Sequence, residues 1–449
     1  MVCSYCFSNN VVKRGLRQKK LEAVQLYLCK ACRKTFTPHL TRGKHYPLPV
    51  IFDAVSIYNL GYSLEQTCRI VNARHQKTPP SGALVNLQID SLNGWTDTLK
   101  RSIVALANAV KSQFNWGVDS PGVEPGRLGV SAQPSEPAEP TPSPVSHMTI
   151  TPSTLSHWLT EFKDYLSYLR LREFAVKRYA PKDTVIHATL AHRQLFRYRF
   201  HAAKCALMIQ EDIQHRRFRP LQDFLELVPS ECPHQYFSQG LRASEVPLTF
   251  SKTQMIVRAK QNYATKLAAF VLQSVKDNKA RHEALQKFML ANDSVTVATE
   301  VPVYLTRDDL EHMQTQLGFE LYTKTNTPSE VELPKLITGH IDILQIRNGQ
   351  AHLLDYKPKA EKDRPIEQLT LYAMALSRLT GLRLFEFKCA WFDENDYFEF
   401  YPLHVLHKTK KAARRRNVRT IEGRYQVNQD PQRIKTIRPV EPRKKYDIL

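Results

Sequence analysis

Two aspartates and a lysine lie close together in an otherwise apolar stretch of the chain. Asp342, Asp355 and Lys357 belong to the segment GHIDILQIRNGQAHLLDYKP, which runs from Gly339 to Pro358. Opposed carboxylates can bind a divalent cation against a phosphate, and a nearby ammonium group can orient water or stabilise developing negative charge. This chemistry requires a fold that brings the three groups to one point.

The dipeptide Asn348-Gly349 indicates how the fold does so. Asn-Gly between apolar runs is a strong signal for a two-residue β-hairpin turn. With these two residues at the tip, Asp342 faces Asp355 with Cβ atoms about 5 Å apart. Lys357 lies on the same face as Asp355, because side chains alternate along a strand. Like charges opposed in this way destabilise a sheet unless a cation lies between them, so the pattern predicts a Mg²⁺ or Mn²⁺ site.

An exposed hairpin with ordinary surface acids is the alternative interpretation. Its difficulty is that Ile341, Ile343, Leu353 and Leu354 make the two strands apolar on both faces. We therefore expect a buried hairpin whose acids have a function.

The same stretch resembles the core of the PD-(D/E)xK nucleases, in the RecB-like branch. The resemblance covers about residues 255–402 and rests on matches in the expected order. Gly-His-Ile-Asp342 and Asp355-Tyr-Lys357 match the central motif, ARHEALQKF and ATEVPVYL match the helix and strand upstream, and EQLTLYAMAL matches the Gln-x3-Tyr helix downstream. The resemblance implies a restriction-endonuclease-like α/β core, a mixed sheet flanked by helices, and hydrolysis of phosphodiester bonds.

The resemblance also implies roles for particular residues. Asp342 and Asp355 would be metal ligands with Lys357 at the attacking water, and Gln368 and Tyr372, at i and i+4 of a helix, would face DNA or the active site. His282 and Glu300 would be further ligands. The chain departs from the family at Asn278, where a glycine often precedes the histidine by four, so His282 could instead be a plain surface histidine, and Glu300 could be structural. No four-cysteine pattern flanks this region, and we expect no iron–sulfur cluster.

Four cysteines near the N-terminus predict a second kind of metal site. Cys3, Cys6, Cys29 and Cys32 form two Cys-x2-Cys pairs, which is the spacing of a structural zinc site. Four thiolates leave no open coordination position, so this Zn²⁺ would have no catalytic role. The basic residues near these cysteines are candidate DNA contacts: Lys13, Arg14, Arg17, Lys19, Lys20, Arg33 and Lys34.

The segment YLCKACRKTFTPH resembles the zinc ribbon that begins many insertion-sequence transposases, where a helix-turn-helix follows. Helical spacing runs from Leu48 to Leu60, Gly61 breaks it, and the capping box Ser63-Leu-Glu-Gln66 opens a second helix to about Asn72. The third, base-reading helix has two candidates. One spans residues 82–92, and the other begins at Thr151 and resembles the start of a transposase recognition helix, with Ser153, Thr154 and His157 as candidate DNA contacts.

The segment between these candidates is rich in proline from Gly117 to Ile150, a composition that cannot pack a core. We favour an insertion of about residues 80–150 inside the helix-turn-helix. An ordinary linker behind an N-terminal domain that ends near residue 92 is the alternative.

The middle of the chain, residues 152–290, shows mainly helical patterns, including RQLFRYRFHAAKCALMIQEDI. Its cysteines and histidines fit no metal-site spacing. Buried cysteines and surface histidines are the simpler interpretation of His201, Cys205, Cys232 and His234.

Composition and charge point to a polyanion partner. The 449 residues carry a formal net charge of +21, concentrated in the first 80 residues and from Val405 to the C-terminus. A solubilising surface with a disordered tail is the alternative for the C-terminal part. No apolar run is long enough for a membrane span, and the N-terminus lacks the pattern of a secretory signal. We therefore expect a DNA partner and no membrane, with a cytoplasmic, nucleoid-associated location, or a nuclear one in a eukaryote.

Together these features predict a multidomain α+β protein. The expected order is a zinc ribbon (1–45), the first part of a helix-turn-helix (46–78), an insertion or linker (79–150), a recognition helix and helical region (151–250), a nuclease domain (251–404) and a basic tail (405–449). The predicted function is a metal-dependent deoxyribonuclease directed by its own DNA-binding region, from a mobile element or phage. A catalytically inactive DNA-binding regulator or accessory protein is the alternative, and an RNA-cleaving nuclease is a third. A homodimer and mobile-element partner proteins both remain open.

Overall fold

The computed structural model describes most of the chain outside the proline-rich interval. The described residues are 3–18, 23–37, 44–76, 149–250, 252, 257–275, 277, 280–323, 333–406, 417–420 and 423–426. Residues 74–148 form a separate unit, because their contacts are mostly with one another, and only residues 74–76 of this unit are described. Within the described ranges, no helix is both long and apolar enough to cross a membrane.

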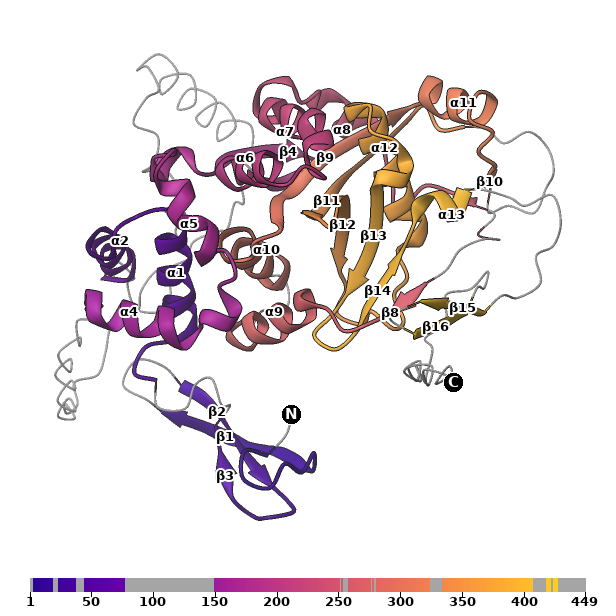
Figure 1. The fold of residues 1–449 in the computed structure, drawn as a ribbon. Coiled ribbons are helices and arrows are strands. Elements are labelled where there is room, and N and C mark those ends of the chain that lie inside the picture. Colours follow the sequence, from indigo (N-terminus) through magenta and orange to yellow (C-terminus); the bar gives the residue numbers. More distant parts are fainter. Residues whose placement is uncertain are drawn as a thin grey trace, which may run out of the picture. The chain divides into compact units, whose positions relative to one another are not determined.

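The N-terminal segment forms a small antiparallel sheet in the order β1-β2-β3 (Figure 1). Its strands are β1 (Val11–Gln18), β2 (Ala23–Cys29) and β3 (Thr35–Phe36). Cys3, Cys29 and Phe36 are buried together and make up its small core. Such a core is too small to be stable alone, and below about 40 residues a metal is usually needed.

Two helices follow where the sequence predicts them: α1 (Leu48–Asn59) and α2 (Leu64–Gln76). Gly61 between them has φ +108°, a conformation that favours glycine. The capping box is present, because the backbone N–H of Gln66 donates to Ser63 Oγ (3.1 Å) and that of Ser63 donates to Gln66 Oε1 (3.0 Å). The predicted start of the second helix is therefore confirmed.

Helix α4 (Pro152–Glu161) begins after the interval that the structure leaves undescribed. The side chain of Thr151 caps its N-terminus, and α4 packs against α1. Two hydrogen bonds join the end of α2 to the start of α4: Asn72 Nδ2 donates to the carbonyl of Ile150 (3.0 Å), and the Ile150 N–H donates to Asn72 Oδ1 (2.8 Å). The residues on either side of the predicted insertion thus lie next to each other. The alternative helix at 82–92 lies outside the described residues.

The C-terminal part is built on a large mixed sheet in the order β4-β5-β9-β11-β12-β13-β14-β8, with β6 paired to β11. Neighbouring strands are antiparallel except for β12 with β13 and β11 with β6. The strands are β4 (Ile186–His192), β5 (Gln194–Phe200), β6 (Leu241–Arg242), β8 (Arg258–Ala259), β9 (Thr296–Thr306), β11 (Leu336–Arg347), β12 (Gln350–Tyr356), β13 (Phe387–Phe392) and β14 (Tyr397–Phe400). The α+β class with a mixed sheet is confirmed.

The prediction of a helical middle is wrong for residues 186–200. This segment is the hairpin β4–β5, and β5 pairs with β9 through Arg199–Thr299 and Phe200–Ala298. The physical reason is a two-residue period: Tyr198 and Phe200 are buried, with arginines between and before them. The sheet therefore begins well before residue 251.

Helices cover the sheet and connect its strands. They are α5 (Leu169–Val176), α6 (Ala202–Glu211), α7 (Arg219–Glu231), α8 (His234–Gln239), α9 (Tyr263–Val271), α10 (Ala280–Asn292), α11 (Arg307–Thr315), α12 (Ile366–Thr380) and α13 (Pro402–Leu406). Helix α12 packs against β9, β12 and β13, and α10 packs against β9 and β11 (Figure 1). Two short strand pairs complete the described fold: β7 (Leu248–Phe250) with β10 (Leu321–Thr323), and β15 (Asn417–Thr420) with β16 (Gly423–Gln426) in the basic C-terminal part.

Candidate active site

The central hairpin has the turn and the register expected from the sequence. Asn348 and Gly349 have φ values of +51° and +66°, the positive values that a type I′ turn needs at both positions. The ladder between β11 and β12 extends from the turn to the pair Ile343–Leu354. One step further, the same register places Asp342 opposite Asp355.

A third carboxylate belongs to the same row. Strand β9 pairs with the other edge of β11, and the pairs Ile341–Val301 and Ile343–Thr299 flank Asp342. This register places Glu300 beside Asp342, so three neighbouring strands present three carboxylates in one line. Glu300 has φ +53°, an uncommon backbone conformation for a residue with a side chain. Local strain of this kind is often found at functional sites.

Two basic side chains contact carboxylates of the row. Lys357 Nζ lies 2.9 Å from Asp355 Oδ2, and His282 Nδ1 lies 3.3 Å from Asp342 Oδ2. His282 is in the first turn of α10, and Gln286, one turn later, donates from Nε2 to Glu300 Oε1 at 2.6 Å. Helix α10 therefore contacts two of the three carboxylates.

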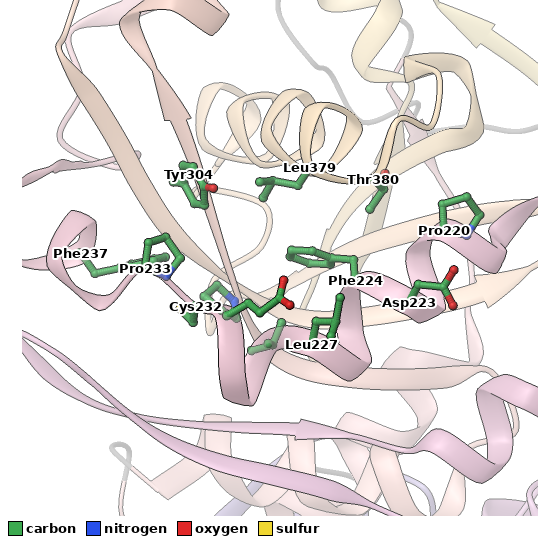
Figure 2. A pocket seen from close by; sticks show the side chains of 13 residues that line it. Pro220, Asp223, Phe224, Leu227, Cys232, Pro233, Phe237, Tyr304, Leu379 and Thr380 are labelled. Carbon is green, nitrogen blue, oxygen red and sulfur yellow. The ribbon is translucent and has the colours of Figure 1, made fainter.

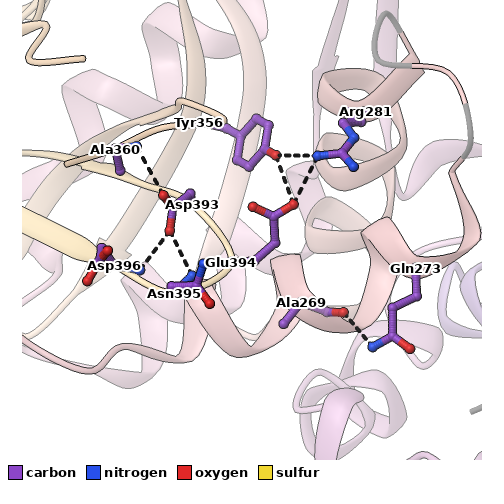
Figure 3. Close-up of polar contacts among 9 residues, drawn as sticks. All are labelled: Ala269, Gln273, Arg281, Tyr356, Ala360, Asp393, Glu394, Asn395 and Asp396. Atoms are coloured by element: carbon purple, nitrogen blue, oxygen red, sulfur yellow. Dashed lines mark hydrogen bonds and ion pairs between the residues drawn. The ribbon is translucent and has the colours of Figure 1, made fainter. Parts of the chain in front are cut away.

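A separate polar network fixes α10 against β12 (Figure 3). Arg281 NH1 lies 3.1 Å from Glu394 Oε1 and 3.4 Å from Tyr356 Oη, and Tyr356 donates to the same Glu394 oxygen at 3.2 Å. Tyr356 stands between Asp355 and Lys357 in the chain, and its ring also contacts the ring of His282 edge-on. The network thus positions His282 relative to the lysine and the aspartates.

The electrostatics of the row follow from burial and from like charge. Burial and the neighbouring Asp342 carboxylate raise the pKa of Asp355 well above its ordinary value. The same two causes raise the pKa of Glu300 to about 7. Burial opposes ionisation of Asp342 as well, but its contact with His282 outweighs burial and lowers the pKa of Asp342. Removing a proton from the row is therefore unfavourable unless further positive charge is supplied.

The unsatisfied atoms of the row fit a divalent cation. Oδ2 of Asp342 and Oδ2 of Asp355 are buried and lack a well-aligned hydrogen-bond donor, although each has a basic group nearby. Carboxylate oxygens are the ligands that Mg²⁺ and Mn²⁺ prefer, and one to three carboxylates leave positions for water and phosphate. The donor set present therefore suits such an ion.

Helix α12 contributes the two polar residues that the Gln-x3-Tyr pattern predicted. Gln368 Nε2 donates to Tyr372 Oη at 2.9 Å. The helix begins after Pro365 and ends at Gly381, whose φ is +71°, and both residue types are common at these positions. The ring of Tyr372 lies on the backbone of Gly339: a Cβ added there would be 2.1 Å from Tyr372 Cε1. The glycine at the start of the central motif is therefore required by close approach of the tyrosine.

These groups share one cavity of about 360 Å³. All seven predicted residues line it: His282, Glu300, Asp342, Asp355, Lys357, Gln368 and Tyr372. Sequence reasoning missed other lining residues, including His192, Arg242 and His340. His340 could have been found, because it lies two residues before Asp342 and so on the same strand face. His192 and Arg242 come from strands that were not predicted.

The cysteines of the N-terminal sheet also converge. The Sγ atoms of Cys3 and Cys32 are 3.6 Å apart, those of Cys6 and Cys29 are 3.5 Å apart, and all four lie within 4.8 Å of one another. A tetrahedral zinc site with Zn–S bonds of 2.3 Å has sulfur atoms about 3.8 Å apart. The cluster therefore confirms the zinc-ribbon geometry predicted from the spacing.

The predicted DNA contacts are mostly exposed. Those of the ribbon region are Lys13, Arg14, Arg17, Arg33 and Lys34, and the first three lie on strand β1. Lys19 and Lys20 lie outside the described residues. On α4, Ser153, Thr154 and His157 line an open hollow together with Lys44 and Trp158.

Comparison with known proteins gives one match. The family model described as the PD-(D/E)XK nuclease superfamily matches residues 230–433, which include β9, β11, β12 and all seven residues of the cavity named above. This match supports a nuclease domain of the PD-(D/E)XK superfamily in this part of the chain. The chain matches none of the curated proteins and none of the solved structures compared with it.

Proposed function

We propose that the protein is a Mg²⁺- or Mn²⁺-dependent deoxyribonuclease of the RecB-like branch. The observation that carries this proposal is the row of three carboxylates across β9, β11 and β12, with Lys357 at Asp355 and His282 at Asp342. Three neighbouring carboxylates that are partly or fully buried and have few hydrogen-bond donors destabilise the fold unless a cation binds there.

In this proposal Asp342 and Asp355 hold the metal, and Glu300 and His282 complete the protein ligands. When bound, the ion polarises the phosphoryl oxygen and lowers the pKa of a water molecule. Lys357 keeps its charge, because the adjacent Asp355 raises its pKa despite partial burial. Its ammonium group can orient the attacking water and stabilise the charge that develops on the phosphate.

Gln368 and Tyr372 would act on the substrate rather than on the metal. Burial raises the pKa of Tyr372, so its hydroxyl stays protonated and can donate a hydrogen bond to a phosphate oxygen. Gln368 fixes that hydroxyl through the 2.9 Å hydrogen bond. Both would position the scissile phosphate in the cavity.

The N-terminal region is proposed to recognise DNA. Its basic residues on β1 and around the second cysteine pair would contact phosphates, which supply affinity without sequence information. Ser153, Thr154 and His157 lie within the first six residues of α4, and the N-terminal part of a recognition helix contacts base edges. The paired hydrogen bonds between Asn72 and Ile150 support the proposal that α1, α2 and α4 form one helix-turn-helix interrupted by an insertion. A role in a mobile element or phage rests on the resemblance to transposase N-termini.

Cleavage of supercoiled plasmid, linear duplex and RNA with Mg²⁺ or Mn²⁺ tests the proposal. The variants Asp355→Ala and Lys357→Ala should lose activity, whereas the matched controls Asp363→Ala and Lys359→Ala, which change exposed residues outside the cavity, should keep it. Binding of DNA without cleavage by the wild-type protein would instead favour a catalytically inactive DNA-binding protein. Faster cleavage of RNA than of either DNA would favour a ribonuclease.

A further inference from the structure

A second cluster of metal-binding side chains lies next to the carboxylate row. His192 ends strand β4, Cys232 follows helix α7, and His234 begins helix α8. One ligand atom of each lies within 4.8 Å of those of the other two. His192 Nε2 is 2.9 Å from His234 Nδ1 and 3.9 Å from Cys232 Sγ. Two segments of the chain therefore bring two imidazoles and a thiol to one point.

The link between Cys232 and His234 is short and rigid. Pro233 has φ −78° and ψ 78°, and the N–H of His234 donates to the Cys232 carbonyl at 2.9 Å. These values describe an inverse γ-turn, and the proline ring restricts its φ further. The two ligands are thus held in place before any ion binds. Cys232 and Pro233 also border an open cavity of about 400 Å³ (Figure 2).

The distances in the cluster suit zinc. Zinc bonds of about 2.0–2.1 Å to nitrogen and 2.3 Å to sulfur, at tetrahedral angles, separate two nitrogens by about 3.3 Å and a nitrogen from a sulfur by about 3.6 Å. The observed 2.9 and 3.9 Å differ from these by only a few tenths of an ångström. Imidazole and thiolate ligands select zinc-like ions over Mg²⁺ and Mn²⁺, which prefer the carboxylates nearby.

We propose that His192, Cys232 and His234 form a second zinc site, distinct from the four-cysteine ribbon, that ties β4 and α8 to the catalytic strand β11. The site has three protein ligands, and its fourth position is left to water.

The remaining nitrogen of His192 explains the connection to β11. His192 Nδ1 lies 2.8 Å from Nε2 of His340. With zinc on Nε2, His192 would carry its proton on Nδ1 and donate a hydrogen bond to Nε2 of His340, which is the usual way in which a metal-bound histidine is oriented. His340 also stacks on Phe196 of β5, with ring centroids 3.5 Å apart, and lines the cavity of the carboxylate row. The zinc would therefore position a residue that stands two places before Asp342.

The number of zinc ions per chain tests the site directly. The full chain would be prepared in an Asp342→Asn/Asp355→Asn background with excess Mg²⁺, so that the carboxylate row does not retain zinc. Mass spectrometry of the metal content should then give two zinc ions per chain. Cys232→Ser and His234→Gln should each reduce this to one. His312→Gln, which changes an exposed histidine of α11, should leave two.

X-ray absorption distinguishes the two sites. When Cys6→Ser and Cys32→Ser remove the ribbon zinc, the ion that remains should have one sulfur and two imidazole neighbours. Because His234 is exposed, its replacement leaves the fold in place even if the buried ligands do not tolerate change. One zinc per chain in the starting protein, or two zinc ions that persist in both Cys232→Ser and His234→Gln, would overturn the proposal.

Discussion

The close contact between Gly339 and Tyr372 makes a quantitative prediction for Gly339→Ala. The added Cβ would lie 2.1 Å from Tyr372 Cε1 and 2.8 Å from Tyr372 Cζ. Carbon atoms in van der Waals contact are about 3.5–4.0 Å apart, so the ring must move by at least about 1.4 Å. The ring is buried, with 7% of the residue exposed, and has little room to move. Overpacking of this kind costs about 1–3 kcal/mol.

The measurement is the free energy of unfolding in urea for the single and double variants. Tyr372→Ala alone should cost about 3–5 kcal/mol, as for other buried aromatic side chains. In the Tyr372→Ala background the added methyl group of Gly339→Ala no longer meets the ring, so its own cost should disappear. The coupling energy should therefore be about 1–3 kcal/mol. Tyr372→Phe is the matched control. It keeps the ring carbons that clash with the added Cβ, so the free-energy cost of Gly339→Ala should persist in this background.

Additive costs in the double variant, within about 0.5 kcal/mol, would refute the reasoning. Cleavage gives an independent reading of the same contact. A ring displaced by more than 1 Å also displaces the hydroxyl that Gln368 fixes, and misplacement on this scale can reduce activity by about 100-fold.

Three further predictions follow from other contacts. Arg281→Ala should reduce cleavage by about 10- to 100-fold and raise the metal concentration needed for half-maximal rate, because it frees α10 from β12. The control Gln273→Ala, which removes a hydrogen bond to the carbonyl of Ala269, should change neither quantity, and equal rates for both variants would contradict this. Lys204→Met should lower the free energy of unfolding by at least about 2 kcal/mol, because the buried Lys204 Nζ donates hydrogen bonds to three backbone carbonyls. An unchanged urea midpoint would contradict a stabilising role of these hydrogen bonds. Arg14→Ala/Arg17→Ala should reduce the slope of log affinity for duplex DNA against log salt by up to about two, and an unchanged slope would exclude both from phosphate contact.

The sequence could predict the hairpin because the type and length of the turn determine which residues of the two strands pair. Asn348-Gly349 selects one turn type, the turn fixes which residues are opposite, and the pairing of Asp342 with Asp355 follows without further information. Both ends of α12 were predictable for a similar local reason, since proline and glycine act within one turn of their own position.

The rest of the site depends on contacts between distant segments. Glu300 belongs to the row because β9 pairs with β11. Its positive φ of +53° also occurs within this paired strand and has no signal in the local sequence. His192 reaches Cys232 and His234 only because the hairpin β4–β5 joins the edge of the sheet. The helical prediction for this hairpin therefore concealed the cluster, and the spacing of the ligands along the chain gave no signal.

Helix α10 contacts both the N-terminal helix α1 and the carboxylate row of the large sheet. On one side it carries His282 and Gln286 into the carboxylate row. On the other it packs against α1: the ring of Phe52 lies 5.3 Å from that of Phe288, and Asn59 Nδ2 donates to Asn292 Oδ1 at 2.7 Å in a buried contact. A buried amide pair fixes relative position more strictly than apolar contact alone, because any shift leaves its polar atoms unsatisfied. The same helix therefore carries both the contacts to α1 and the contacts to Asp342 and Glu300.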